Sequence, residues 1–440
     1  MFVALPELAL PGPAAGLAAA DPDGDGQPEL IVVPTGGPVR AYRWAGSALR
    51  PAAPDGPATG PVGGLAAADL DGDGAEELYL PAPTGPSPRP TDRLLKLLPT
   101  GAWIDLFADP LNRPARGPTG GRVAAALDRR GDGRFGFLVG SDGWPLRLIE
   151  LGRDGRLADL ARALAVGHVV AARGVVAMPL AGDATDLFVT TEGGANLYFR
   201  NRGDGTFAEA ADGGLADAGE HARGAAVVDA GGGAGLCWAN WDGPHRLAVR
   251  EPGGAWRDRA SPAFALPSAA RGAVVADFDN DGREEVFVLH HGEPNRLFRL
   301  AAGAGGAPPT LTRLDPGAAA DFDATAAVVM DADRDGVPEL LLAGPAGVAA
   351  FRARTAGGWL RFVPRTRFGA PARGTAVLAT IDGRDALRVI DGGPHEPVAH
   401  FGLGGGARVT RVTVTWPDGA ALTLGDPDAN CTYDMPYPAG

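Results

Sequence analysis

The sequence is poor in cysteine, in long apolar runs and in basic clusters. Its two cysteines among 440 residues, Cys237 and Cys431, are too few for a disulfide framework and are not spaced as a metal-binding or redox pair. We therefore expect free or buried thiols. The sequence contains no run of about 18 apolar residues, the length needed to cross a bilayer. The N-terminus also lacks the basic region and apolar run of a signal peptide. The chain as written is expected to be cytoplasmic, or secreted if a leader has been removed.

The charge of the chain and the motifs it lacks exclude several classes of function. The net charge is −13, so neither nucleic acid nor an anionic membrane is an expected partner. Familiar catalytic signatures are absent as well: the sequence has no GxSxG elbow, P-loop, HExxH motif or GxGxxG between a strand and a helix. The sequence alone leaves open whether the protein is an enzyme.

Glycine and proline are abundant. The chain has 67 glycines and 40 prolines, and a helix-like spacing of apolar residues occurs only near residues 157–164, where we expect one turn at most. Many short strands joined by tight turns account for this composition. The expected fold class is all-β.

The stretch from Arg271 to Gly292 places a cluster of acids between two apolar runs. The acids are Asp277, Asp279, Asp281 and Glu285. Alternate aspartates direct their oxygens into one small volume, Gly282 permits a sharp turn, and the last acid closes the cage, which suits Ca²⁺. An EF-hand would need a bidentate acid at the twelfth position, where Val288 stands in a strand-like run. We predict a calcium loop within a β-hairpin.

The same loop occurs four times intact. The predicted calcium ligands are Asp21, Asp23, Asp25, Glu29, Asp69, Asp71, Asp73, Glu77, Asp277, Asp279, Asp281, Glu285, Asp331, Asp333, Asp335 and Glu339. Eroded copies begin near Asp128, Met178 and Asp229, so that seven units follow one another at intervals of about 50 residues. Without a cation, the mutual repulsion of these clustered carboxylates would oppose folding.

The rest of each unit repeats as well and indicates four short strands. Such a unit, with a period of about 40 to 50 residues, is typical of a β-propeller blade, because a closed ring buries faces that one unit cannot bury alone. We predict a seven-bladed, integrin-like β-propeller over residues 1–358, with Phe2 to Leu5 completing the last blade, and a small C-terminal β domain over residues 359–440. Residues 373–390 also imitate the start of a blade, so an eighth blade in place of the separate domain stays open.

Two sets of motifs resemble known families. The DxDxDG loops between strands, together with NRGDGTFAEAADGGLADAG from residue 201 to 219, look like the FG-GAP or VCBS repeats of integrin-type propellers. The segment HFGLGGGARVTRVTVTWPDG (residues 400–419) is similar to the signature of the ASPIC/UnbV domain of the cartilage acidic protein and UnbV family, and FGAPARGTAVL (residues 368–378) looks like the start of that domain. The resemblance covers essentially the whole chain. It implies structural calcium in the four intact loops.

Four histidines are candidates for catalytic or ligand-binding roles. His290 and His291 end a predicted strand far from the calcium loop of their unit, and His221 and His245 lie in connections of units that have lost their loops. With nearby tryptophans they could line a small-molecule pocket. An exposed turn and ordinary core packing are the simpler explanations of the same residues.

Two functions fit these observations. The first is a calcium-stabilised, non-catalytic scaffold that binds a protein, a glycan or a small molecule, as FG-GAP propellers commonly do. The second is a tailoring or cyclase-type enzyme of a natural-product pathway, as the resemblance to UnbV suggests, with a pocket on the propeller axis. The fold does not decide between them. Secretion would favour the scaffold, and a closed central pocket with converging acidic or histidine side chains would favour the enzyme.

Overall fold

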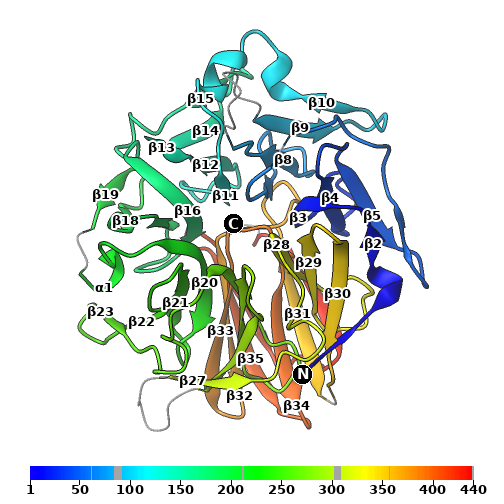
Figure 1. Cartoon of the computed structure of the whole chain (residues 1–440), viewed down its shortest axis with the longest axis vertical. Coiled ribbons are helices and arrows are strands. Elements are labelled where there is room, and N and C mark those ends of the chain that lie inside the picture. The colour runs from blue at the N-terminus through cyan, green and yellow to red at the C-terminus, as the bar shows by residue number, and fades with distance from the viewer. Residues whose placement is uncertain (61, 84–91, 211–212, 302–308, 356, 439–440) are drawn as a thin grey trace.

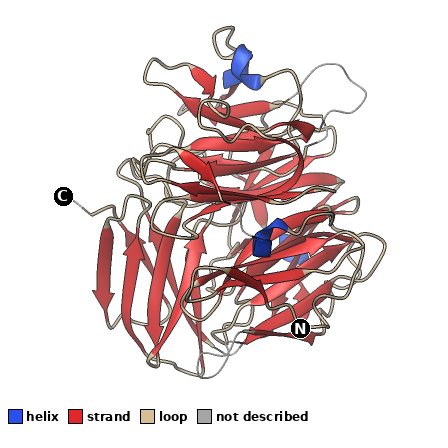
Figure 2. Ribbon diagram, turned by 90° about the vertical axis from the view of Figure 1, so that its left-hand side faces the viewer, coloured by secondary structure: helices blue, strands red, loops and turns tan. Residues whose placement is uncertain are grey.

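The computed structural model describes residues 1–440 except 61, 84–91, 211–212, 302–308, 356 and 439–440. The described residues are almost entirely strands and turns (Figure 2), which confirms the predicted all-β class. The helices are single turns: η1 (Pro6–Leu8), η2 (Leu106–Ala108), η3 (Arg113–Arg116) and α1 (Gly213–Ala216). Within the described part of the chain, no helix is long and apolar enough to cross a membrane.

The first three sheets follow the chain in order and are antiparallel. The first contains β3 (Ala14–Ala20), β4 (Glu29–Pro34), β5 (Arg40–Trp44) and β6 (Leu49–Pro51). The second contains β7 (Ala66–Ala68), β8 (Glu77–Leu80), β9 (Arg93–Leu97) and β10 (Trp103–Asp105). The third contains β11 (Val123–Leu127), β12 (Gly136–Gly140), β14 (Arg147–Leu151) and β15 (Leu157–Asp159).

The next three sheets repeat the same order of strands. The fourth contains β16 (Val169–Met178), β17 (Asp186–Thr191), β18 (Leu197–Asn201) and β19 (Phe207–Glu209), and β13 (Asp142–Pro145) pairs with the start of β16. The fifth contains β20 (Ala222–Asp229), β21 (Ala234–Asn240), β22 (Arg246–Arg250) and β23 (Trp256–Asp258). The sixth contains β24 (Ala270–Ala276), β25 (Glu285–His290), β26 (Arg296–Ala301) and β27 (Thr310–Leu314).

The seventh sheet joins the two ends of this region. It contains β28 (Ala326–Met330), β29 (Glu339–Gly344), β30 (Gly347–Ala353), β1 (Phe2–Ala4) and the short β2 (Leu10–Pro11). Strand β1 pairs antiparallel with β30, with Phe2 opposite Ala353, as predicted for the residues that complete the last unit. Figure 1 shows the seven sheets arranged around a central axis, and the first strands of neighbouring sheets contact one another there.

Continuous apolar runs such as LIVV in β4 arise because each sheet is covered on both faces. Side chains alternate along a strand, so Leu30 and Val32 pack between the first and seventh sheets, whereas Ile31 and Val33 pack between the first and second. Each strand thereby contributes to two apolar clusters. The ring closes because every sheet has two neighbours.

The remaining strands form two sheets, which we call the C-terminal module. One contains β31 (Gly358–Pro364), β34 (Ala399–Gly404) and β37 (Cys431–Met435), and the other contains β32 (Thr375–Ile381), β33 (Arg384–Ile390), β35 (Val409–Thr415) and β36 (Ala421–Gly425). They enclose a shared apolar core that includes Phe362, Val412 and Trp416. Residues 373–390, which imitate a blade, thus belong to a sheet of this module. The exact boundary at residues 358 and 359 stays a prediction.

The C-terminal module lies against the end of the ring that carries the acidic loops. Three of its arginines are largely buried there: Arg361, Arg373 and Arg388. Arg361 donates to Asp331 (2.6 Å), Arg373 to Glu76 (3.0 Å), and Arg388 lies 3.4 Å from Glu284. The module is therefore joined to the ring by ion pairs at the same loops that were predicted to bind calcium.

A segment of the module, residues 391–396, enters the end of the central channel. It hydrogen-bonds to the innermost strands of four sheets, through the pairs Gly392–Ala177, Gly392–Ala126, Pro394–Ala19 and Glu396–Val329 at 2.8–3.2 Å. We call residues 391–396 the plug segment. It lies on the side of the ring that carries the acidic loops.

Candidate metal centres

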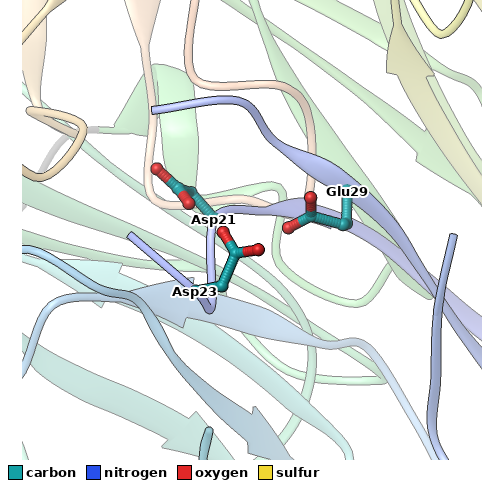
Figure 3. Close-up of side chains that lie close together, drawn as sticks. All are labelled: Asp21, Asp23 and Glu29. Atoms are coloured by element: carbon teal, nitrogen blue, oxygen red, sulfur yellow. The ribbon is translucent and has the colours of Figure 1, made fainter. Parts of the chain in front are cut away.

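Each intact loop brings three of its four predicted ligands together. One carboxylate oxygen from each of three acids lies within 4.8 Å of the other two in every group. The groups are Asp21, Asp23 and Glu29; Asp69, Asp71 and Glu77; Asp277, Asp279 and Glu285; and Asp331, Asp333 and Glu339. Figure 3 shows the first group, with two acids from the loop and the third from the start of β4. The geometry is that of a small oxygen-lined cage.

The first aspartate of each loop organises the turn. Asp277 accepts the N–H groups of Asp281 (3.1 Å) and Gly282 (2.9 Å), and the first aspartate of each other intact loop likewise accepts the N–H of the equivalent glycine. Gly282 has φ of +88°, a left-handed conformation that favours glycine. This explains why glycine follows the third aspartate in every intact copy.

The closing glutamate fastens the loop to the second strand. Its Oε2 accepts the N–H of the second loop residue in three loops, at 2.7 Å between Leu70 and Glu77, for example. In the first loop that residue is Pro22, which has no N–H, and Oε2 of the buried Glu29 has no partner in the described structure. Oδ1 of the buried Asp331 is unpartnered as well. Buried carboxylate oxygens without donors are suitable ligands for a hard cation.

The third aspartate of each loop lies outside these groups. Asp281 accepts the N–H of Arg283 (2.9 Å) and Asp25 that of Gln27 (2.9 Å), so both stabilise the turn. The corresponding residues of the other loops, Asp73 and Asp335, do the same. A ligand role for these four aspartates stays a prediction.

Burial raises the pKa of the carboxyl groups in the cages. The pKa of Glu29 is raised to about 8 and that of Glu285 to about 9, in each case chiefly because the carboxyl is buried and further because a neighbouring aspartate repels its charge. Burial thus favours the protonated form of these carboxyl groups, and their contribution to folding stability falls as the pH rises from the ordinary carboxyl pKa toward the raised value. A bound cation would remove this cost.

A basic residue lies in each cage, and sequence reasoning missed it. Lys96, the only lysine of the chain, places Nζ 2.6 Å from Asp71, 2.7 Å from Asp73 and 2.8 Å from Glu77. The other three cages hold an arginine in the same way: Arg43, Arg299 and Arg352. The expected repulsion among the carboxylates is thus partly relieved without any ion. We call these four residues the resident cations.

The resident cations occupy a fixed place in the repeat. Each lies on the third strand of its sheet, and Arg299 is the cross-strand partner of Glu285. At the same register of the third and fifth sheets, Gly136 faces Glu150 and Gly235 faces Val249. In the two sheets where glycine replaces the closing glutamate, the third strand therefore lacks the basic residue as well. A basic residue 13 to 19 positions after each closing glutamate was the available sequence signal.

Replacing a resident cation is expected to change ion affinity and stability in opposite directions. In Arg299→Met the guanidinium no longer competes for Asp279 and Glu285, so the calcium affinity of this site should increase by about tenfold, while the ion-free protein melts at a lower temperature. Calorimetric titration with calcium and thermal unfolding in EGTA measure both effects. Arg200→Met, on the third strand of a sheet without an intact loop, is the matched control. Weaker calcium binding by Arg299→Met would contradict the competition.

Two of the candidate histidines have structural roles. Nδ1 of His245 accepts the N–H of Asn240 (3.1 Å). In the next sheet the side chain of Asn295 accepts the N–H of His290 (2.9 Å) in the same way. His245 therefore takes the place of the asparagine that precedes the third strand. Ser268 joins Nε2 of His245 (2.9 Å) to Nε2 of His290 (2.7 Å). Burial lowers the pKa of both rings, to about 3 and about 4, and both are inaccessible to solvent.

The other two histidines lie at the surface. His291 stacks on Trp241 with ring centroids 6.1 Å apart, and the side chain of His221 is exposed. Trp238, which with Trp241 makes up the tryptophans near these histidines in the sequence, is buried and packs on Phe188. The structure therefore does not bring the four histidines together around one accessible cavity.

Comparison with known proteins finds two families and a set of relatives. The FG-GAP-like repeat family matches residues 21–80, and the ASPIC and UnbV family matches residues 367–440. Cartilage acidic protein 1 of Homo sapiens is 38% identical over 392 residues, covering 79% of this chain and 58% of that protein. The Mus musculus protein of the same name is 37% identical over 390 residues, covering 79% and 60%. The chain thus spans less than two thirds of the length of these curated relatives.

A solved structure of BBS1N in complex with ARL6DN matches with a TM-score of 0.47 and 10% sequence identity, covering 80% of this chain and 95% of that chain. This likeness is too weak to support any assignment.

Proposed function

The chain belongs with cartilage acidic protein 1 among proteins that join FG-GAP-like repeats to an ASPIC and UnbV domain, and on that premise we propose that it is a calcium-binding β-propeller scaffold. In this proposal residues 1–358 form a seven-bladed propeller, residues 359–440 form the ASPIC/UnbV domain, and Ca²⁺ occupies the four intact loops. The single observation that carries it is the fourfold recurrence of the same carboxylate cage.

The residues of the cages fit a hard cation. Their donors are all carboxylate oxygens, the ligand type that calcium prefers, and unpartnered buried oxygens of Glu29 and Asp331 face no protein donor. A bound Ca²⁺ would neutralise the buried carboxylates. The chain's own residues do the rest: the first aspartate holds the turn, and the closing glutamate ties the loop to the second strand.

The name of the relatives refers to cartilage, and on that ground we propose that the chain works outside the cell. Extracellular modules bind calcium with dissociation constants of about 10⁻⁴ to 10⁻³ M. Sites in which calcium competes with a resident cation and with protons suit that range. The partner held by the scaffold is a protein, a glycan or a small molecule.

Counting bound ions tests the proposal. Native mass spectrometry in calcium should find four ions on the protein and three on Asp277→Asn. Asp128→Asn is the matched control, because Asp128 accepts the same turn bonds, from Gly133 for example (2.7 Å), in a loop without a complete cage; it should keep four. Binding at pH 7 should also release protons, because the pKa of the closing glutamates is raised. Four ions on Asp277→Asn, or none on the parent protein, would contradict the proposal.

A further inference from the structure

A cavity of about 800 Å³ lies at the end of the ring opposite the C-terminal module. It is lined by the starts of the innermost strands, including Ala14, Val123 and Ala326, whereas the acidic loops follow the ends of these strands. Pro394 of the plug segment also lines it. The volume is in the range of small-molecule sites, about 300 to 1,000 Å³.

Four arginines line one side of this cavity: Arg122, Arg173, Arg223 and Arg271. They come from the same position of the third, fourth, fifth and sixth sheets. On the opposite side the lining is apolar and small, and it includes Leu17, Val62 and Leu65. The cavity is therefore divided into a cationic half and an apolar half. The chain has a net charge of −13, so its composition does not lead one to expect four arginines around one cavity.

The carboxylates near these arginines are fewer than the arginines. Asp142, Glu192 and Asp323 form the ion pairs with the four guanidinium groups, among them Arg223 with Glu192 at 2.7 Å and Arg271 with Asp323 at 2.7 Å. Nε of Arg223 is buried and has no partner in the described structure. Burial and repulsion from Arg173 lower the pKa of Arg223. Positive charge is thus left over at the cavity wall.

Trp241 adds a flat aromatic surface beside the arginines. Its ring lies 5.2 Å from the guanidinium carbon of Arg223 and stacks on His291. An aromatic face next to a cationic rim suits a ligand that has both a planar or apolar body and a negative group. The side chain of Trp241 is only partly buried, so it can be covered further by a ligand.

We propose that this cavity binds a small organic anion, whose acidic group is held by Arg173 and Arg223 and whose apolar body lies between Trp241 and the apolar half of the wall. The proposal names a ligand class for the scaffold and to that extent rests on the proposed function. It does not depend on calcium, because the arginines lie at the opposite end of the innermost strands from the cages.

Two dyes that differ in one charged group test it. The probe is 8-anilinonaphthalene-1-sulfonate, and the neutral reference is N-phenyl-1-naphthylamine. We expect the sulfonate to bind at one site per chain and about tenfold more tightly than the neutral dye, and Arg223→Met to weaken it by about tenfold. Arg156→Met, which removes an equally charged but exposed side chain, should change nothing. Equal affinity for the two dyes, or an unchanged affinity in Arg223→Met, would overturn the proposal.

Further arms separate loss of the site from loss of the fold. Arg122 is more exposed, with a single carboxylate partner 3.4 Å away, so Arg122→Met should fold normally and still weaken the sulfonate. Circular dichroism and the calcium count are measured on the same samples, so failure of the cages and failure of the cavity are distinguishable. Displacement of the dye by 2-naphthoate or by 2-naphthyl phosphate tells whether the site prefers a carboxylate or a phosphate. Displacement by neither anion contradicts the proposal.

Discussion

Removing calcium with EGTA is expected to lower the midpoint of thermal unfolding by about 12 °C. An ion present at about 100 times its dissociation constant stabilises the folded chain by about 2.7 kcal/mol, so four ions contribute about 11 kcal/mol. The entropy of unfolding of about 2.1 cal/mol/K per residue gives about 0.9 kcal/mol/K for 440 residues. Differential scanning calorimetry in calcium and in EGTA measures the shift.

Magnesium is the control for this experiment. It requires near-octahedral geometry and gives up its water reluctantly, so it should restore only a small part of the lost stability. Lys96 and the three arginines of the cages limit the loss, because they pair with the same acids when the ion leaves. A melting temperature that is the same in EGTA and in calcium would mean that these loops are held by the resident cations alone.

A second large effect is expected from Arg373→Met, at the contact between the module and the ring. The side chain is 1% exposed and donates to Glu76 (3.0 Å), to the carbonyl of Gly393 (2.8 Å) and to that of Ala19 (3.2 Å). Removing it leaves a buried carboxylate without its cation, which typically costs about 3 to 5 kcal/mol. Urea denaturation should show this loss of stability, and limited proteolysis should show a more accessible C-terminal module.

The double variant Arg373→Met with Glu76→Gln separates the ion pair from the packing. It removes both charges and should recover part of the lost stability, since the carboxylate is then no longer unpaired. Arg408→Met removes an exposed arginine of the same module, paired with Asp426 at 2.8 Å and 74% exposed, and should change stability by less than about 0.5 kcal/mol. Equal losses in Arg373→Met and Arg408→Met would show that the buried pair contributes nothing to stability.

Local patterns predicted the strands and the loops well. The alternation of aspartates and the glycine at a left-handed position are fixed within a few residues, so the turn at Asp277 could be inferred from the sequence alone. Near residues 157–164, where one turn at most was expected, the N–H of Leu164 donates to the carbonyl of Leu160, and that of Val166 to the carbonyl of Ala161. The pairing of β1 with β30 was also expected, because the last repeat lacks a fourth strand of its own and residues at the N-terminus can supply it.

Contacts between distant segments were not predictable in the same way. Arg373 and Glu76 are 297 positions apart, and nothing in either local pattern marks them as partners. The resident cations were missed because a cross-strand neighbour depends on the length of the intervening turn, which is longer before Lys96 than before Arg299. His245 was a candidate site because its substitution for asparagine is visible only once His245 and Asn295 are aligned in space.

The plug segment has a consequence for the kinetics of the cavity. Its hydrogen bonds anchor it to the innermost strands of four sheets, and its Pro394 lines the same cavity as the four arginines. A molecule bound there would therefore contact the ring and the C-terminal module at once. A substitution that loosens the module should for this reason shorten the residence time of the occupant, although it removes none of the arginines.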